Sequence, residues 1–365
     1  MAYDDQRPGN DAVAWDVAQK VARQLLSRVQ PLEARLAAQL EADLTEATEH
    51  AESIVTELTG LRSSHGPARA TVTDRGGWVD ANVASFRRLL RPLGERLANG
   101  SPRARRALNP ASRAASGVEV GLLLAWMSGR VLGQYDLLPA DGSADGDVVY
   151  YVGPNILELE RRHGFAPREF RLWIAVHEVT HRMQFTGVPW LRDHFLGLVE
   201  RGMSLAAPDG RVVLESLIRA ASEIRAGRNP LAEGGVVGLL ASSEQLETLR
   251  EAQALMSLLE GHGDVVMGLA GEDLIPGARR FAETLRERRA SASGVARAVQ
   301  QLVGIEAKMR QYAEGEKFVE RVREEGGDDL LAAVWSDPEM LPSLDEIRSP
   351  DGWIERAGGV AAGRA

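Results

Sequence analysis

The stretch FRLWIAVHEVTHRMQF, residues 170–185, decides how this chain is interpreted. It contains no Pro or Gly, and its apolar residues recur at helical intervals, so the pattern predicts a helix over about Pro167–Thr186. Within that helix His177 and His181 are four positions apart. They therefore share one face, with Cβ atoms about 5–6 Å apart.

Two imidazoles placed in this way can converge on one zinc ion. Glu178 projects roughly 100° around the helix from His177, where its carboxylate can take a proton from water at the open position of the metal. The motif therefore indicates a zinc hydrolase in which Glu178 is the general base. The alternative is a buried helix whose two histidines only cap or bridge neighbouring elements.

A catalytic zinc ion usually has a third protein ligand. Glu260 and Asp264 are four apart in a helix expected over Ser243–Leu269, and so lie on one face. Glu260 can complete the zinc sphere while Asp264 accepts the N–H of a ligating histidine. His262 is the second choice for this ligand and Glu200 the third.

Composition restricts the remaining possibilities. The chain has 365 residues, 44% of them hydrophobic, a formal net charge of −9 and no Cys. A metal site must therefore use nitrogen and oxygen ligands, and the charge argues against nucleic acid or an anionic membrane as partner. The longest apolar run, Val118–Met127, is too short to span a bilayer. The first ten residues lack the features of a signal peptide, so a cytoplasmic protein is expected.

The fold class expected is mainly α with a small β-sheet (α+β). Helices are predicted at residues 13–29, 33–58, 78–97, 111–135, 156–162, 167–186, 189–205, 211–226, 243–269, 278–289, 294–303 and 308–325, and strands at 68–73 and 147–152. We expect a disordered N-terminus (1–11), a single domain (12–345) with residues 12–110 as a candidate helical subdomain, and a C-terminal tail (346–365).

Three further features have two interpretations each, and a fourth has a specific local role. Val148–Val152 is either an edge strand that pairs with an extended peptide or an ordinary sheet strand. Tyr312 either donates a hydrogen bond to an oxyanion or packs in a helical core. Residues 232–241 form either a lid or a plain interhelical loop. Asn155 occupies the expected N-cap of the following helix.

Glu260 and Asp264, downstream of His-Glu-x-x-His, resemble the gluzincin arrangement. In that arrangement the Glu is the third zinc ligand and the Asp is a partner of the first His, which implies these roles for Glu260 and, toward His177, for Asp264. The chain departs from the familiar pattern because 78 residues lie between His181 and Glu260. Extra helices must therefore be inserted.

The chain as a whole, from about residue 12 to 345, resembles a mainly actinobacterial family of zincin-like proteins. Its members are labelled hydrolases or zinc-dependent metalloproteases, and one branch is named for an association with biosynthesis of a deazaflavin coenzyme. The resemblance implies a zincin-like fold and a zinc site. It is carried by Trp15-Asp16, Thr73-Asp74-Arg75 with Trp78 and Asn82, YVGPN at 151–155, Trp173 with HEVTH at 177–181, LEGHGD at 259–264, Gln311-Tyr312 with Gly315 and Phe318, and Trp335 with Leu341-Pro342.

The expected activity is hydrolysis of a peptide or small amide substrate by a zinc-activated water. The expected ligands are His177, His181 and Glu260, with Glu178 as base and Tyr312 as a further catalytic candidate. The alternative is a zinc-stabilised scaffold or pseudoenzyme that binds a partner. The presence of Glu178 distinguishes the hydrolase from the scaffold, because a purely structural zinc site does not need that carboxylate.

Overall fold

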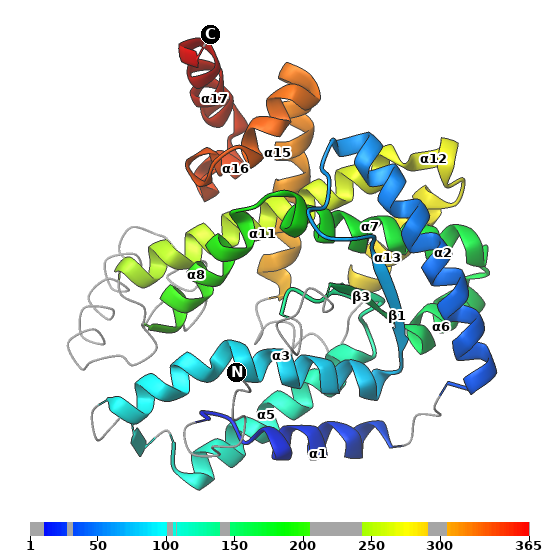
Figure 1. Cartoon of the computed structure of the whole chain (residues 1–365), viewed down its shortest axis with the longest axis vertical. Coiled ribbons are helices and arrows are strands. Elements are labelled where there is room, and N and C mark those ends of the chain that lie inside the picture. Colours follow the sequence, from blue (N-terminus) through cyan, green and yellow to red (C-terminus); the bar gives the residue numbers. More distant parts are fainter. Residues whose placement is uncertain are drawn as a thin grey trace. The chain divides into compact units, whose positions relative to one another are not determined.

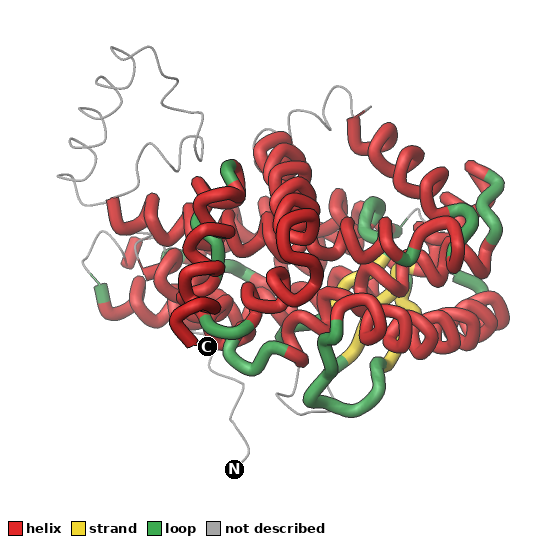
Figure 2. The backbone as a smooth tube through the Cα atoms, turned by 90° about the horizontal axis from the view of Figure 1, so that it is seen from above, coloured by secondary structure: helices red, strands yellow, loops and turns green. Residues whose placement is uncertain are grey.

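The computed structural model describes residues 11–27, 32–100, 105–106, 108–138, 147–204, 243–290 and 305–364. The described chain is mostly helical, with one small sheet that is yellow in Figure 2. The expected mainly helical fold with a small sheet is confirmed. Among the described helices, none combines the length and apolar character needed to cross a bilayer.

The chain divides into two compact units. The first comprises Met1–Glu57, Arg62–Met183 and Asp273–Gly277. The second comprises Leu58–Leu61, Gln184–Glu272 and Ala278–Ala365.

The first unit contains the sheet and the helices around it, and Figure 1 labels these helices and the strands β1 and β3. Its core includes Trp15, Trp78, Val83 and Leu124, which are all buried and pack in one cluster. The described elements in chain order are α1 (Trp15–Leu26), α2 (Ala34–Thr59), β1 (Arg69–Thr73), α3 (Arg75–Asn99), α5 (Pro110–Ser128), β2 (Gly133–Tyr135), β3 (Val148–Val152), α6 (Gly153–His163) and α7 (Pro167–Gly187), whose last turn belongs to the second unit.

The second unit is built around α11 and α15. Phe318, Val322 and Trp353 are fully buried in its core, and the Trp353 indole donates a hydrogen bond to the carbonyl of Met340 (2.7 Å). The further described elements are α8 (Leu191–Ser204), α11 (Ser243–Leu269), α12 (Gly271–Leu274), α13 (Ala278–Ala290), α15 (Ile305–Ala332), the 3-10 turns η2 (Ala333–Trp335) and η3 (Pro338–Met340), α16 (Leu344–Arg348) and α17 (Pro350–Arg364).

The sheet has the strand order β1-β3-β2, so β3 is its central strand. β3 runs parallel to β1 and antiparallel to β2, with Gly133 opposite Tyr151. The interpretation of Val148–Val152 as an edge strand is therefore wrong, and the ordinary sheet strand is what the structure has. β2 and β1 are the edges.

Two local predictions also differ from the structure. The helix expected over 111–135 ends at Ser128, and its last three residues form β2. Asn155 is not an N-cap, because α6 begins at Gly153. Its buried side-chain amide donates to the carbonyls of Ser128 (2.7 Å) and Val131 (2.6 Å) and so anchors the connection that leads into β2.

Several predicted segments lie outside the described residues. They are the N-terminal residues 1–10, the helices expected at 211–226 and 294–303, and the lid or loop at 232–241. Residues 346–365, expected as a tail, include α17.

Candidate metal centre

The motif residues 177–181 lie within the helix α7, as the pattern predicts. Its apolar residues Ile174, Val176 and Val179 are almost completely buried. His177 and His181, on another face, are only partly buried. The helix is thus held by its apolar face while both imidazoles stay accessible to a ligand.

The two imidazoles face one another through their Nε2 atoms. These atoms are 3.2 Å apart, and the ring planes are inclined at 82° with centroids 4.6 Å apart. Two nitrogens that bind one tetrahedral zinc at about 2.0–2.1 Å lie about 3.3 Å from each other. The spacing of His177 and His181 therefore fits a shared zinc ion.

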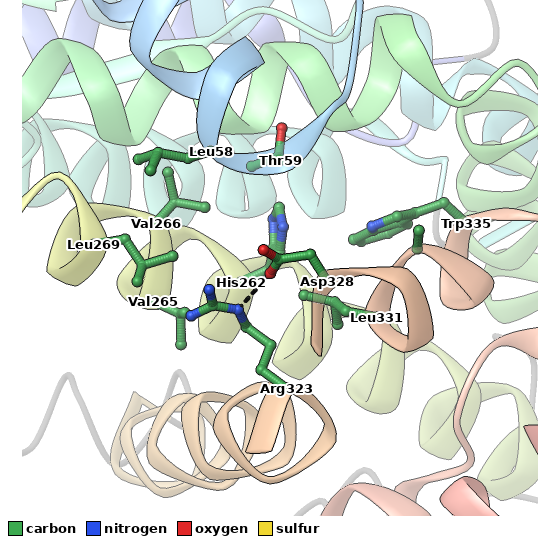
Figure 3. A pocket seen from close by; sticks show the side chains of 11 residues that line it. Leu58, Thr59, His262, Val265, Val266, Leu269, Arg323, Asp328, Leu331 and Trp335 are labelled. Carbon is green, nitrogen blue, oxygen red and sulfur yellow. Dashed lines mark hydrogen bonds and ion pairs between the residues drawn. The ribbon is translucent and has the colours of Figure 1, made fainter. Parts of the chain in front are cut away.

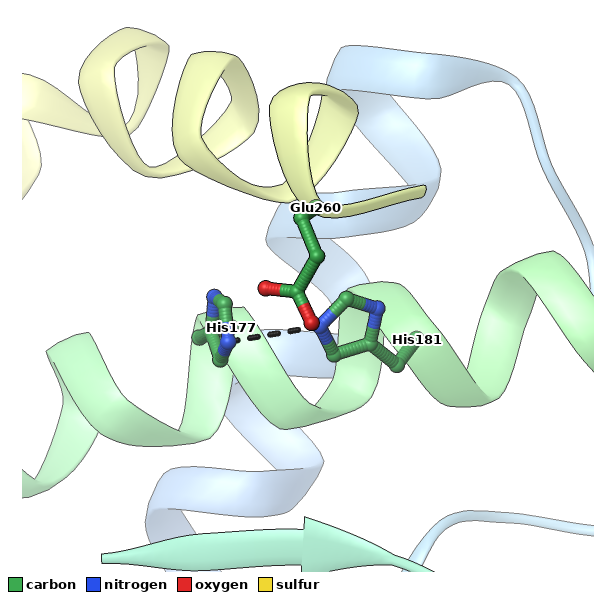
Figure 4. A group of neighbouring side chains, drawn as sticks. All are labelled: His177, His181 and Glu260. Atoms are coloured by element: carbon green, nitrogen blue, oxygen red, sulfur yellow. Dashed lines mark hydrogen bonds between the residues drawn. The ribbon is translucent and has the colours of Figure 1, made fainter. Parts of the chain in front are cut away.

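Glu260 on α11 completes a group that could hold a metal ion. One ligand atom each of His177, His181 and Glu260 lie within 4.8 Å of one another, and Figure 4 shows the carboxylate directed toward the imidazoles. Two histidines and one glutamate are a known ligand set of catalytic zinc, with a fourth position left for water or substrate. The donor chemistry of this group therefore suits zinc.

The residue after Glu260 fixes the packing of α11. A Cβ atom on Gly261 would lie 2.2 Å from the carbonyl carbon of Gly315 and 2.4 Å from the amide nitrogen of Glu316, both in α15. Such distances are impossible, so only glycine allows the two backbones to approach this closely. The contact limits rotation of α11 at the position next to Glu260.

Gln184 in the last turn of α7 binds the same region of α11. Its side-chain nitrogen donates to the carbonyl of Leu259 (3.0 Å) and contacts Nδ1 of His262 (3.0 Å), and both bonds are buried. Because an amide nitrogen only donates, Nδ1 of His262 must be the acceptor and Nε2 must carry the proton. The neutral tautomer of His262 is thereby set.

The other side of His262 lines a small cavity of about 20 Å³. Trp335 packs edge-on against the imidazole, with ring centroids 5.3 Å apart. Arg323 and Asp328 line the same cavity and form an ion pair of 2.7 Å (Figure 3). The cavity has room for about one water molecule, so it is too small to hold a peptide or amide substrate.

Glu178 lies against the sheet. The residue is 7% exposed, and its side chain packs on Gly133 of β2. Tyr151, opposite Gly133 on β3, has a phenol whose pKa is raised by burial and further by the charge of Glu178, although its hydrogen bond with Thr48 (2.7 Å) acts in the other direction. Tyr151 therefore stays neutral beside the carboxylate.

Arg182, the residue after His181, is fully buried and ion-paired. Its guanidinium binds both oxygens of Asp147 (2.6–3.1 Å) and one oxygen of Glu52 (3.1 Å). It also donates to the carbonyl of Gly66. Because these partners come from α2 and from the segments flanking β1 and β3, the guanidinium ties the motif helix to the rest of the first unit.

A model of zincin-like metallopeptidases matches residues 13–354. The chain belongs to the zincin-like metallopeptidase family. The expectation of a zincin-like family is thus confirmed, whereas the actinobacterial and deazaflavin parts of it stay predictions.

A solved structure is also similar to this zincin-like protein. It is a crystal structure from Chloroflexus aurantiacus, described as that of a candidate hydrolase with a novel fold. The two sequences are 30% identical, the TM-score is 0.70, and the match covers 94% of this chain and 98% of the other. No curated protein matches the chain. Family and neighbour together support a hydrolase or peptidase function.

Four other residues are candidates for the site. His262 is 2% exposed and directs Nδ1 to Gln184, and the metal group contains Glu260 in its place. Glu200 is exposed on α8. Asp264 is partly buried one turn after Glu260, and its role toward His177 stays a prediction. Tyr312 belongs to α15, but its side chain lies outside the described residues.

A larger groove of this zincin-like protein contains none of the three metal-group residues. Its volume is about 990 Å³, and His194 is among its lining residues. Its arginines are already compensated, for example Arg201 by Glu251 and Arg250 by Asp345, both at 2.9 Å. The pKa of His194 is lowered, mainly by burial. The size of this groove alone does not identify it as the site of chemistry.

Proposed function

We propose that this protein is a zinc-dependent peptidase in which His177, His181 and Glu260 hold the metal and Glu178 is the general base. The observation that carries the proposal is the 3.2 Å separation of the two Nε2 atoms with a carboxylate in the same group. Membership in the zincin-like metallopeptidase family supports the same conclusion.

When bound, zinc supplies a Lewis acid that polarises the substrate carbonyl and acidifies a water molecule. Glu178 then accepts the proton of the attacking water on its carboxylate and later passes it to the leaving nitrogen. The helical spacing supports this role, because Glu178 follows His177 by one residue and so projects about 100° around the helix from it.

The substrate that we propose is an extended peptide that pairs with β2. The amide of Val152 donates to Leu132 (2.8 Å), and the amide of Asp136 donates to Val148 (3.1 Å). Because backbone groups alternate along a strand, the intervening Gly133 directs its own backbone away from β3. An edge strand oriented in this way can add a peptide strand, next to the base at Glu178.

The test uses Glu178→Gln and a mixture of synthetic peptides with products read by mass spectrometry. The variant keeps the size of the side chain but cannot accept a proton, so zinc content should hold while kcat falls by about 10²–10⁴-fold. Glu200→Gln, on an exposed carboxylate of α8, is the control and should keep full activity.

Undiminished peptide cleavage in Glu178→Gln would reject Glu178 as the base. A zinc-loaded wild-type protein that cleaves no peptide or small amide would favour the alternative function, a zinc-stabilised scaffold that binds a partner.

A further inference from the structure

Gly133 lies so close to the Glu178 side chain that a residue with a Cβ atom would clash with it at position 133. A Cβ atom on Gly133 would lie 2.6 Å from Cγ, 2.8 Å from Cδ and 2.8 Å from Oε1 of Glu178. Carbon atoms in van der Waals contact are about 3.5–4.0 Å apart. The carboxylate of Glu178 therefore rests on the bare backbone of β2, and glycine in a strand often marks such a close approach.

The strand cannot withdraw to make room for a side chain. On one side of Gly133, the carbonyl of Leu132 is bound by the amide of Val152 (2.8 Å). On the other side, Gln134 and Asn82 of α3 exchange hydrogen bonds through their side-chain amides (3.2 and 3.3 Å). Position 133 is thus fixed between two anchored residues.

The helix cannot withdraw either. Val179, next to Glu178, is completely buried. Arg182, one turn later, is held by its buried ion pairs with Asp147 and Glu52. A methyl group added at position 133 would consequently press on Cγ, Cδ and Oε1 of Glu178 and displace that side chain.

We propose that Gly133 is a positioning residue that sets the place of the Glu178 carboxylate. The proposal rests on the function proposed above, in which that carboxylate accepts the proton. A displacement of about 1 Å in a reacting group can reduce a rate by about 10²-fold. A residue without a side chain is therefore needed at position 133 for the correct position of the Glu178 carboxylate, and not only for the packing of the strand.

The test compares Gly133→Ala with Gly129→Ala in zinc-loaded protein. An added Cβ at Gly129 would have its nearest neighbour at 3.9 Å, so this variant is the matched control in the same connection. Gly133→Ala should lower kcat by about 10–100-fold, with KM within about twofold and zinc content unchanged. Gly129→Ala should leave all three at the wild-type value.

A second pair of variants separates positioning from general damage to the fold. In a Glu178→Ala background the Cγ, Cδ and Oε1 atoms that the new Cβ would meet are absent. Gly133→Ala should then keep the residual kcat within about twofold of that of Glu178→Ala alone. An equal loss in both backgrounds, or no loss in either, would overturn the proposal.

A measurement that needs no substrate turnover tests the positioning role of Gly133 independently of the proposed peptidase function. In protein labelled with 13C at the Glu carboxyl carbon, the Glu178 resonance is identified by its disappearance in Glu178→Gln. Gly133→Ala should shift that resonance and Gly129→Ala should not. Unchanged resonance positions in both variants would reject the positioning role, even if the wild-type protein proved to have no peptidase activity.

Discussion

Gln184 and His262 are joined by a buried hydrogen bond of 3.0 Å between Nε2 and Nδ1, and the same amide nitrogen binds the carbonyl of Leu259. Leu259 precedes Glu260, and Gln184 follows His181 by three residues. One side chain thus connects the end of the motif helix to the turn of α11 that presents Glu260.

Gln184→Glu should therefore weaken zinc binding, although residue 184 is not one of the proposed zinc ligands. The carboxylate cannot donate to Leu259 or to Nδ1 of His262, so the amide clamp is lost. Groups that orient zinc ligands typically contribute about 10–100-fold in affinity, and a loss of that size is expected in competition with a chromogenic chelator.

The control for this variant is Ser257→Ala. The Ser257 hydroxyl is buried and bonds to the carbonyl of Gln253 within α11 itself (2.8 Å). Zinc affinity should stay at the wild-type value in this control. Equal affinities in Gln184→Glu and wild type would show that the clamp does not place Glu260.

Arg182→Met should lower the free energy of unfolding strongly. The substitution removes the buried guanidinium that pairs with Asp147 and Glu52. Removing one partner of a buried ion pair costs about 3–5 kcal/mol. Urea unfolding of the metal-free protein measures the loss. Arg201→Met breaks an ion pair whose side chains are about half exposed, so it should cost at most about 1 kcal/mol. Similar losses in the two variants would contradict a structural role for the buried network.

Asp136, directly after β2, should make stability fall as the pH rises. Burial raises the pKa of its carboxyl above the ordinary value of 3.8, although the Leu138 amide, the Arg88 charge and Ser85 act in the opposite direction. Between 3.8 and the raised value, the folded chain keeps a proton that the unfolded chain has lost. The stabilisation is complete below this window and is lost as the pH rises through it.

Asp136→Asn stays neutral and should remove this contribution. Its free energy of unfolding, relative to that of the wild type, should increase across the window when urea unfolding is measured at a series of pH values. A difference that is constant with pH would contradict the raised pKa. Asp16→Asn, on an exposed carboxylate of α1, serves as the comparison.

The long helices could be predicted closely from the sequence. The range expected for α11, Ser243–Leu269, is the range in the structure, and the motif helix differs by one residue at its end. In both, apolar residues repeat at helical spacing over more than five turns, and that periodicity is a local property. The pair His177 and His181 could be proposed for the same reason, since helical faces follow from spacing. Glu260 was one of three candidates for the third ligand, and the resemblance to the gluzincin arrangement favoured it.

Strand β2 could not be predicted from the sequence. The contact between the Glu178 side chain and Gly133 of this strand was therefore missed as well. Three residues are too few to show an alternating pattern, and a helix was expected over residues 111–135. The strand exists because Gly133–Tyr135 pair with Val149–Tyr151. Such pairing depends on partners elsewhere in the chain, so local propensity does not reveal it.

The residues that hold the site in place were missed for a related reason. Arg182 is 130 positions from Glu52, and Gln184 is 78 positions from His262. Nothing in the spacing of such residues identifies their partners. A polar side chain on the buried side of an apolar helix is the only available signal, since buried charges and amides are almost always paired.

The most direct test of the whole account is the zinc content of the protein. Elemental analysis of wild-type protein purified without added metal should give close to one zinc per chain. Glu260→Ala should bind zinc far more weakly, whereas Glu200→Ala should bind it as the wild type does. A well-folded wild-type preparation that neither carries zinc nor takes it up on addition would contradict the central claim.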